Sequence, residues 1–175
     1  MRPLYIYLST FLSILAISCS KDHEIPIADL EYKEFRSPHK KHPRLDIYEV
    51  FFFSNIDLDS FFIKKGGSPR LYCSLENSNN FDIKEITQNN RNLSGSFYFL
   101  NQNKKQSGKF LFRSEVFFYD KDDEFLNKKR ILKLLSNKSC IPCKVEERFY
   151  LNTYKPYLSN SMCIPVKDIL KVINE

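Results

Sequence analysis

The chain has 175 residues, 42% of them hydrophobic, and a formal net charge of +6 from 27 Lys and Arg against 21 Asp and Glu. This length accommodates one domain and leaves no room for a second of ordinary size. The positive charges are interspersed with negative ones rather than gathered in a long basic helix, so nucleic acid is not an expected partner.

The N-terminal segment has the parts of a secretory signal. It starts with a charge at Arg2, continues as an uncharged stretch from Pro3 to Ile17, and ends in small residues before Cys19. The stretch is about fifteen residues long, whereas a helix needs roughly 20 apolar residues to cross the hydrocarbon core of a bilayer. A cleaved signal is therefore favoured over a permanent membrane span.

The residues Ala16-Ile17-Ser18-Cys19 resemble the bacterial lipobox. The resemblance implies that residues 1–18 are a signal peptide and that Cys19 is acylated, so that a lipoprotein is held in the membrane by its acyl chains. The alternative is an ordinary secretory signal in which Cys19 is a chance thiol.

The run Lys21-Asp22-His23-Glu24 directly follows that cysteine. It is similar to the export signal of surface-exposed lipoproteins of the Bacteroidota, which implies an outer-membrane protein that faces the medium. The periplasmic face of the outer membrane is the alternative location.

Residues 19–44 are predicted to be a lipidated tether. Pro26, Pro38 and Pro43 punctuate this segment, and proline removes a backbone donor and favours extended neighbours. His39 and His42 could offer imidazoles to a metal or contact anionic headgroups, but no carboxylate or thiolate accompanies them. A hydrated linker is the preferred interpretation, and no metal site is expected.

From Leu45 onward, apolar and polar residues alternate with a period of two between turn signals, which is typical of strands. Gly66, Gly67, Gly95 and Gly108 lie in the polar stretches, where turns are expected. The pattern predicts a mainly β domain over residues 45–175, an immunoglobulin-like β-sandwich with a small β-barrel as the alternative. The predicted strands are 45–53, 70–76, 96–101, 109–119 and 144–152.

Two later segments carry helical or ambiguous patterns. Residues 125–135 fit either a buried strand or a short amphipathic helix, and the strand is preferred. In residues 165–174, Pro165 is suited to the first helical position and Val166, Ile169 and Ile173 recur at helical spacing, which predicts a short C-terminal helix.

The stretch from Val116 to Leu126 contains an aromatic strand, the acidic turn Tyr119-Asp120-Lys121-Asp122-Asp123, and a second apolar segment. It resembles the strand–turn–strand hairpin of immunoglobulin-like domains in bacterial lipoproteins, including the FxLYD type, with Asp123 in place of the usual glycine. The resemblance implies a fold class and transfers no site. A calcium loop is disfavoured, because the glycine and the final glutamate of an EF-hand are missing.

The predicted domain contains four cysteines, Cys73, Cys140, Cys143 and Cys163. In an oxidising compartment they are best interpreted as structural disulfides, with three possible pairings and a preference for one long-range bridge from Cys73. Cys140 and Cys143 have the spacing of a redox-active pair, but a thioredoxin-like site needs the pair at a helix start early in the domain. A zinc site of four thiolates is a third, less favoured possibility.

Catalytic motifs are absent from the sequence: we find no phosphate-binding glycine loop, no nucleophile elbow and no zinc-protease motif. Glu146 and Glu147 are neighbours on a predicted strand and should point to opposite faces. No catalytic residue and no cofactor is therefore expected. The sequence favours a non-enzymatic lipoprotein that binds a protein or envelope component. The alternatives are a periplasmic thiol-disulfide protein that uses Cys140 and Cys143, and an immunity-type inhibitor of an exported toxin.

Overall fold

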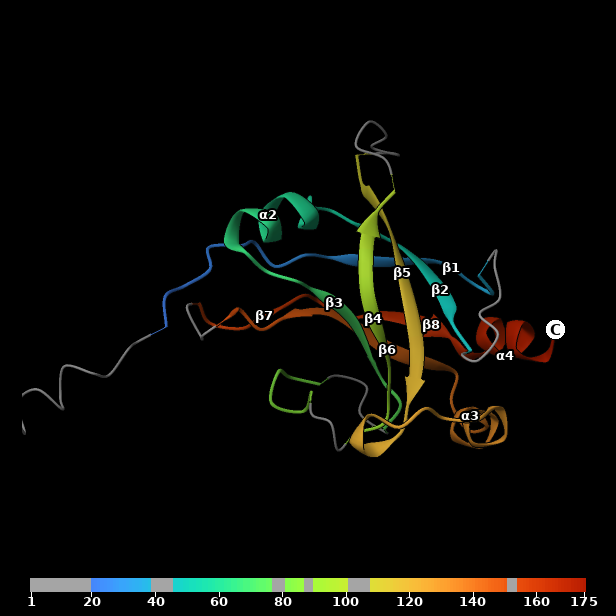
Figure 1. Ribbon diagram of the computed structural model, residues 1–175. Helices are drawn as coiled ribbons and strands as arrows, with labels where there is room; N and C mark the ends of the chain where they lie inside the picture. Colours follow the sequence, from blue (N-terminus) through green and yellow to red (C-terminus); the bar gives the residue numbers. More distant parts are fainter. Residues whose placement is uncertain (1–19, 39–45, 77–80, 87–89, 101–107, 151–153) are drawn as a thin grey trace, which may run out of the picture.

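The computed structural model describes residues 20–38, 46–76, 81–86, 90–100, 108–150 and 154–175 (Figure 1). The predicted signal peptide, Cys19, His39 and His42 lie outside these ranges. The strands are β1 (Leu30–Arg36), β2 (Tyr48–Ser54), β3 (Arg70–Ser74), β4 (Asn92–Phe99), β5 (Phe110–Tyr119), β6 (Cys140–Glu147), β7 (Tyr157–Leu158) and β8 (Met162–Pro165), and the helices are α2 (Leu58–Lys65), α3 (Lys128–Leu135) and α4 (Val166–Asn174), with a short 3-10 turn at Lys121–Asp123.

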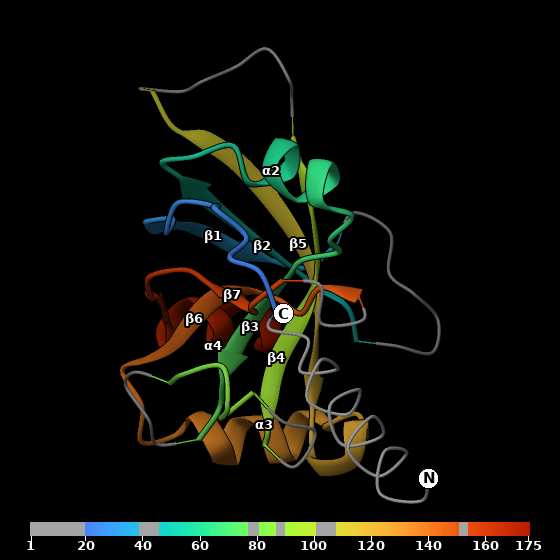
Figure 2. The same cartoon turned by 90° about the vertical axis from the view of Figure 1, so that its left-hand side faces the viewer.

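The strands form one antiparallel sheet in the order β1-β2-β5-β4-β3-β6-β7, with β8 also pairing β6. The sheet curls until β1 lies beside β8, and the backbone N–H of Asn160 donates to the carbonyl of Ala28 at 2.9 Å. Figures 1 and 2 show how the β4–β5 pair crosses the direction of β1 and β6. The prediction of a mainly β domain with a short C-terminal helix is confirmed. The strands expected to form a sandwich belong to one continuous, curled sheet.

The core lies inside this curl and follows the alternation read from the sequence. Phe112, Val116 and Phe118 of β5 are buried as predicted. Phe52 of β2 pairs with Phe112 in register, and the two rings stack with their centroids 5.5 Å apart. Burying each such side chain contributes about 1.5–3 kcal/mol, so this strand pair is a main source of stability.

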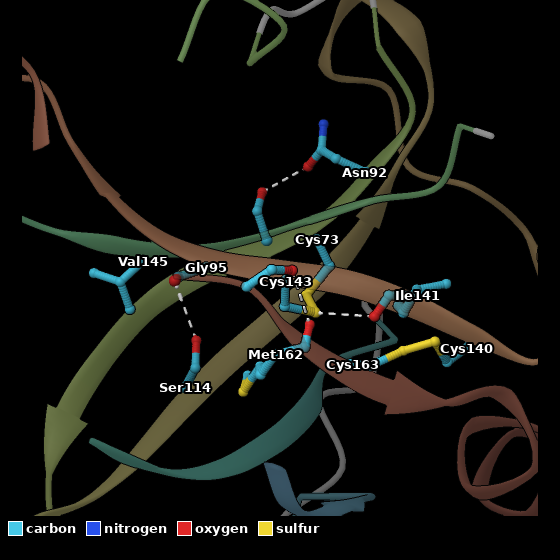
Figure 3. Close-up of a disulfide and its surroundings, with 12 residues drawn as sticks. Cys73, Asn92, Gly95, Ser114, Cys140, Ile141, Cys143, Val145, Met162 and Cys163 are labelled. Atoms are coloured by element: carbon cyan, nitrogen blue, oxygen red, sulfur yellow. Dashed lines mark hydrogen bonds between the residues drawn. A yellow bond between two sulfur atoms is a disulfide. The ribbon is translucent and has the colours of Figure 1, made fainter. Parts of the chain in front are cut away.

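Gly95 was expected in a turn but lies within β4, where its backbone packs closely against that of β5. A Cβ atom at this position would lie 1.8 Å from the carbonyl oxygen of Glu115, a separation that no side chain can adopt. The hydroxyl of Ser114 donates to the carbonyls of Gly95, at 3.1 Å, and Ser96, at 3.0 Å. Figure 3 shows the Ser114–Gly95 contact. The close approach of the two backbones therefore depends on glycine.

The prediction that residues 19–44 form a tether is wrong in part, because this segment contains β1. This strand pairs with β2, and Ile25, Ala28 and Phe35 are buried. A register shift lies between Tyr32 and Glu34 and interrupts the period-two pattern, as an extra residue in a β-bulge does. The packed domain therefore begins well before residue 45.

The preference for a strand over residues 125–135 is also wrong, because helix α3 occupies residues 128–135. The side chain of Asn127 accepts a hydrogen bond from the backbone N–H of Arg130 at 3.0 Å and caps the first turn. Ile131 and Leu135, one helical turn apart, are buried. This local cap and spacing are enough to favour the helical alternative.

Helix α2 was not identified in the sequence, although its two ends carry standard signals. Asp57 accepts a hydrogen bond from the backbone of Ser60 at 3.2 Å, and Gly66, with φ of 67°, ends the helix. The predicted C-terminal helix is confirmed, with Pro165 just before its first residue, Val166. No helix among the described residues is long and apolar enough to cross a membrane.

Candidate functional site

A pocket of about 510 Å³ opens beside α3. Cationic side chains predominate on its walls, with one carboxylate. The lining residues are Leu75, Glu76, Arg91, Arg130, Lys133, Leu134, Asn137 and Lys138.

Three parts of the chain form the pocket. Leu75 follows β3 and Arg91 precedes β4, and the backbone N–H of Leu75 donates to the carbonyl of Arg91 at 3.0 Å. Helix α3 supplies Arg130, Lys133 and Leu134, none of which is among its buried residues. The turn after α3 supplies Lys138, whose ammonium donates to the carbonyl of Glu76 at 2.9 Å.

A buried carboxylate holds the two guanidinium groups of the pocket. Asp120 is only 5% exposed; it accepts a hydrogen bond from Nε of Arg91 at 2.8 Å and forms an ion pair with Arg130. Burial alone raises the pKa of Asp120, but the hydrogen bond from the Lys121 backbone and the two guanidinium groups outweigh it, so the pKa lies below its ordinary value. Asp120 therefore remains a carboxylate and positions both arginines.

Positive charge remains after these pairs are formed. Arg91 also lies 3.5 Å from Glu76, so among the described residues Asp120 and Glu76 are the carboxylates paired with the arginines of a pocket that four cationic side chains line. No carboxylate of the described residues lies within 4.0 Å of the ammonium of Lys133. Guanidinium forks and ammonium groups recognise phosphate and carboxylate. The pocket is therefore suited to an anionic group.

None of the pocket residues was singled out in the sequence. The only signal was the basic run from Lys128 to Arg130, followed by Lys133 one helical turn later. If this segment were a strand, the side chains of Arg130 and Lys133 would point to opposite faces. As a helix, it places Arg130 and Lys133 on one side.

The four cysteines form two disulfides, Cys73–Cys143 and Cys140–Cys163, which Figure 3 shows side by side. The first joins positions 70 residues apart, on the paired strands β3 and β6, and fulfils the expectation of a long-range bridge from Cys73. The second joins β6 to β8. Cys73 and Cys143 are buried, whereas Cys163 is exposed.

The spacing of Cys140 and Cys143 does not produce a bonded pair. Each thiol is joined to a different partner, and both lie on β6 rather than at the start of a helix. With all four sulfurs in disulfides, four thiolates are not available for zinc.

Glu146 and Glu147 point to opposite faces of β6, as predicted. Glu146 pairs with Arg70 and with Arg148. Glu147 is buried beside Gly67 and Phe149. Burial, together with the neighbouring charge of Glu146, raises the pKa of Glu147. The two carboxylates cannot converge on one substrate atom.

The acidic turn after β5 closes in the predicted place. The backbone N–H of Leu126 donates to the carbonyl of Phe118 at 2.9 Å, and Asp122 and Asp123 have φ of 60° and 59°. Aspartate tolerates this left-handed region better than most residues, which explains how Asp123 replaces glycine. In the described ranges no group of three or more His, Cys, Asp or Glu residues could hold a metal ion.

Comparisons of the chain with protein-family models, with curated proteins and with solved structures find no match.

Proposed function

We propose that this protein is an exported, lipid-anchored binding protein of the outer membrane, and that its domain captures an anionic group of an envelope or protein partner in the pocket beside α3. The observation that carries the binding part is the convergence of Arg91, Arg130, Lys133 and Lys138 on one pocket. The buried Asp120 holds the two arginines before any ligand arrives. Such preorganisation reduces the entropic cost of binding.

The lipid anchor rests on the lipobox resemblance and on the two disulfides, which are compatible with an exported protein. Replacement Cys19→Ala tests it. We expect the variant to lose its acyl chains, seen as a mass decrease of the mature protein, and to leave the membrane fraction. Continued membrane association of the variant would refute the anchor.

Anion binding is tested by titrating the full-length protein with inorganic phosphate in low salt. The double variant Lys133→Gln/Lys138→Gln removes two positive charges from the pocket. We expect it to weaken binding by about tenfold, because each charge contributes up to about 1 kcal/mol. The binding of the wild-type protein should weaken as salt increases.

Helix α3 offers a matched control. Lys128→Gln/Lys129→Gln also removes two positive charges, from the first turn of α3, but neither residue lines the pocket. This variant should bind phosphate almost as the wild-type protein does. Equal losses in both double variants would point to a diffuse basic surface, and a wild-type protein that binds no phosphate would refute the site.

A further inference from the structure

The chain joins the folded domain directly after Cys19. Lys21 forms a parallel bridge with Tyr154, and the backbone N–H of Lys155 donates to the carbonyl of Lys21 at 2.8 Å. Successive α-carbons lie about 3.8 Å apart, so the α-carbon of Cys19 is within about 8 Å of that of Lys21. An acyl chain on Cys19 therefore has no long tether between the membrane and the domain.

The residues that follow the anchor are packed against two other segments. The ammonium of Lys65, at the end of α2, lies 3.6 Å from the carboxylate of Glu24 and 5.0 Å from the ring centroid of Tyr154. Tyr157 donates its hydroxyl proton to the carbonyl of Pro26 at 3.2 Å. Figure 1 shows residues 20–26, the last turn of α2 and β7 at one end of the molecule.

This end exposes apolar side chains beside lysines. Ile27 is 63% exposed, Ile63 is 68% exposed and Tyr150 is 79% exposed. The other large apolar side chains exposed among the described residues are Tyr98 and Phe125. We name the anchor-end surface by its residues: Lys21, Ile27, Ile63, Lys65, Tyr150 and Lys155.

The composition of the anchor-end surface suits a lipid headgroup region. The transfer of isoleucine side chains out of water is favourable. Tyrosine is enriched at the membrane interface, and lysine can extend its ammonium group toward anionic headgroups. Asp22 and Glu24 follow Lys21 in the chain, and Glu24 is paired with Lys65. The surface thus offers three lysines, one of which has a carboxylate partner.

We infer that the anchor-end surface rests on the membrane and fixes the orientation of the domain, an inference that depends on the proposed acylation of Cys19. Helices α3 and α4 lie at the opposite end of the molecule from residues 20–26 (Figure 1). In this orientation the pocket beside α3 faces away from the lipid. The lipid surface then acts as a second contact besides the acyl chains, and the domain does not swing freely.

The absence of tryptophan from the chain permits a direct test. The full-length acylated protein is reconstituted in vesicles of phosphatidylethanolamine and phosphatidylglycerol whose acyl chains carry bromine, a contact quencher of tryptophan. Ile63→Trp and, separately, Ile27→Trp place one fluorophore on the anchor-end surface. We expect both to lose most of their emission relative to vesicles without bromine.

Phe125→Trp is the matched control, because Phe125 is 54% exposed and lies near α3. Its emission should be unchanged by bromine. Equal quenching at positions 63 and 125, or no quenching at positions 27 and 63 in protein that floats with the vesicles, would overturn the orientation while leaving the anchor intact. Protein that does not float with the vesicles would overturn the anchor and the orientation together.

Discussion

Asp120 accepts a hydrogen bond of 2.8 Å from Nε of Arg91; Arg91 directly precedes β4 and Asp120 directly follows β5, at the end of this antiparallel pair where Asn92 faces Tyr119. Arg130 of α3 pairs with the same carboxylate. Asp120 thus connects the sheet to the helix that borders the pocket. Its pKa is lowered, so its contribution to stability should be complete above the unfolded-state pKa of about 4 and lost as pH falls through the lower folded-state pKa.

Replacement Asp120→Asn should destabilise the protein by about 1–2 kcal/mol at pH 7. The value is below that of a fully buried charge pair because both arginines are partly exposed to solvent. Urea unfolding between about pH 7 and pH 3 measures it, and the difference from wild type should shrink at the acidic end. The exposed Asp122→Asn in the same turn should change stability little at pH 7; an equal loss there would refute the role of Asp120.

Glu147→Gln should stabilise the protein at pH 7. The folded state raises the pKa of Glu147 by burial, so the wild-type protein loses stability as pH rises from the unfolded-state pKa through the folded-state pKa. The variant has no charge to bury and escapes this loss. Thermal unfolding should show a higher Tm at pH 7 and no difference below about pH 4.

Glu124→Gln provides the control for this effect, since Glu124 is exposed. It should leave the Tm nearly unchanged. A Glu147→Gln protein that is less stable than wild type at pH 7 would mean that the carboxylate makes a favourable interaction stronger than its burial cost.

The two disulfides should contribute unequally. Cys73→Ala/Cys143→Ala opens a loop of 70 residues and should cost about 4 kcal/mol, whereas Cys140→Ala/Cys163→Ala opens one of 23 and should cost about 3 kcal/mol. Loss of the buried sulfurs adds to the first value. Denaturant unfolding of the two double variants measures both free energies.

Mild reductant acting on the native protein should release Cys140 and Cys163 first, because Cys163 is exposed while Cys73 and Cys143 are buried. Alkylation followed by mass spectrometry identifies the free thiols. A peptide in which Cys140 and Cys143 are joined to each other would contradict this pairing and would favour thiol-disulfide exchange.

Gly95→Ala and Gly108→Ala should lower the free energy of unfolding for different reasons, a steric clash at Gly95 and backbone strain at Gly108. At Gly95 the added Cβ meets the Glu115 carbonyl, so the sheet must open and the loss should exceed about 3 kcal/mol. At Gly108 the φ is 80° and no atom of the described residues lies within 4 Å of the added Cβ, so only about 1 kcal/mol of backbone strain is expected. Similar losses at both sites would refute the close approach of β4 and β5.

The elements that could be predicted from the sequence have a regular local pattern. Strand β5 alternates between buried and half-buried residues, β2 is a nearly continuous run of buried residues rich in aromatic side chains, and the apolar positions of α4 recur at helical spacing. Strand β1 was not predicted, because a register shift breaks its alternation. Helix α3 was predicted as a strand, because the pattern of its eight residues fits a strand or a helix almost equally well.

The sequence by itself determined the mainly β class, the C-terminal helix, the turn after β5 and the face of β5 that enters the core, because each depends on residues close together in the chain. Only the tertiary structure decided which cysteines bond, since the pairing of β3 with β6 brings Cys73 to Cys143 across 70 residues. It alone placed Arg91 beside Arg130, through Asp120. Contacts between distant segments depend on the register and curl of the whole sheet, which no local pattern encodes.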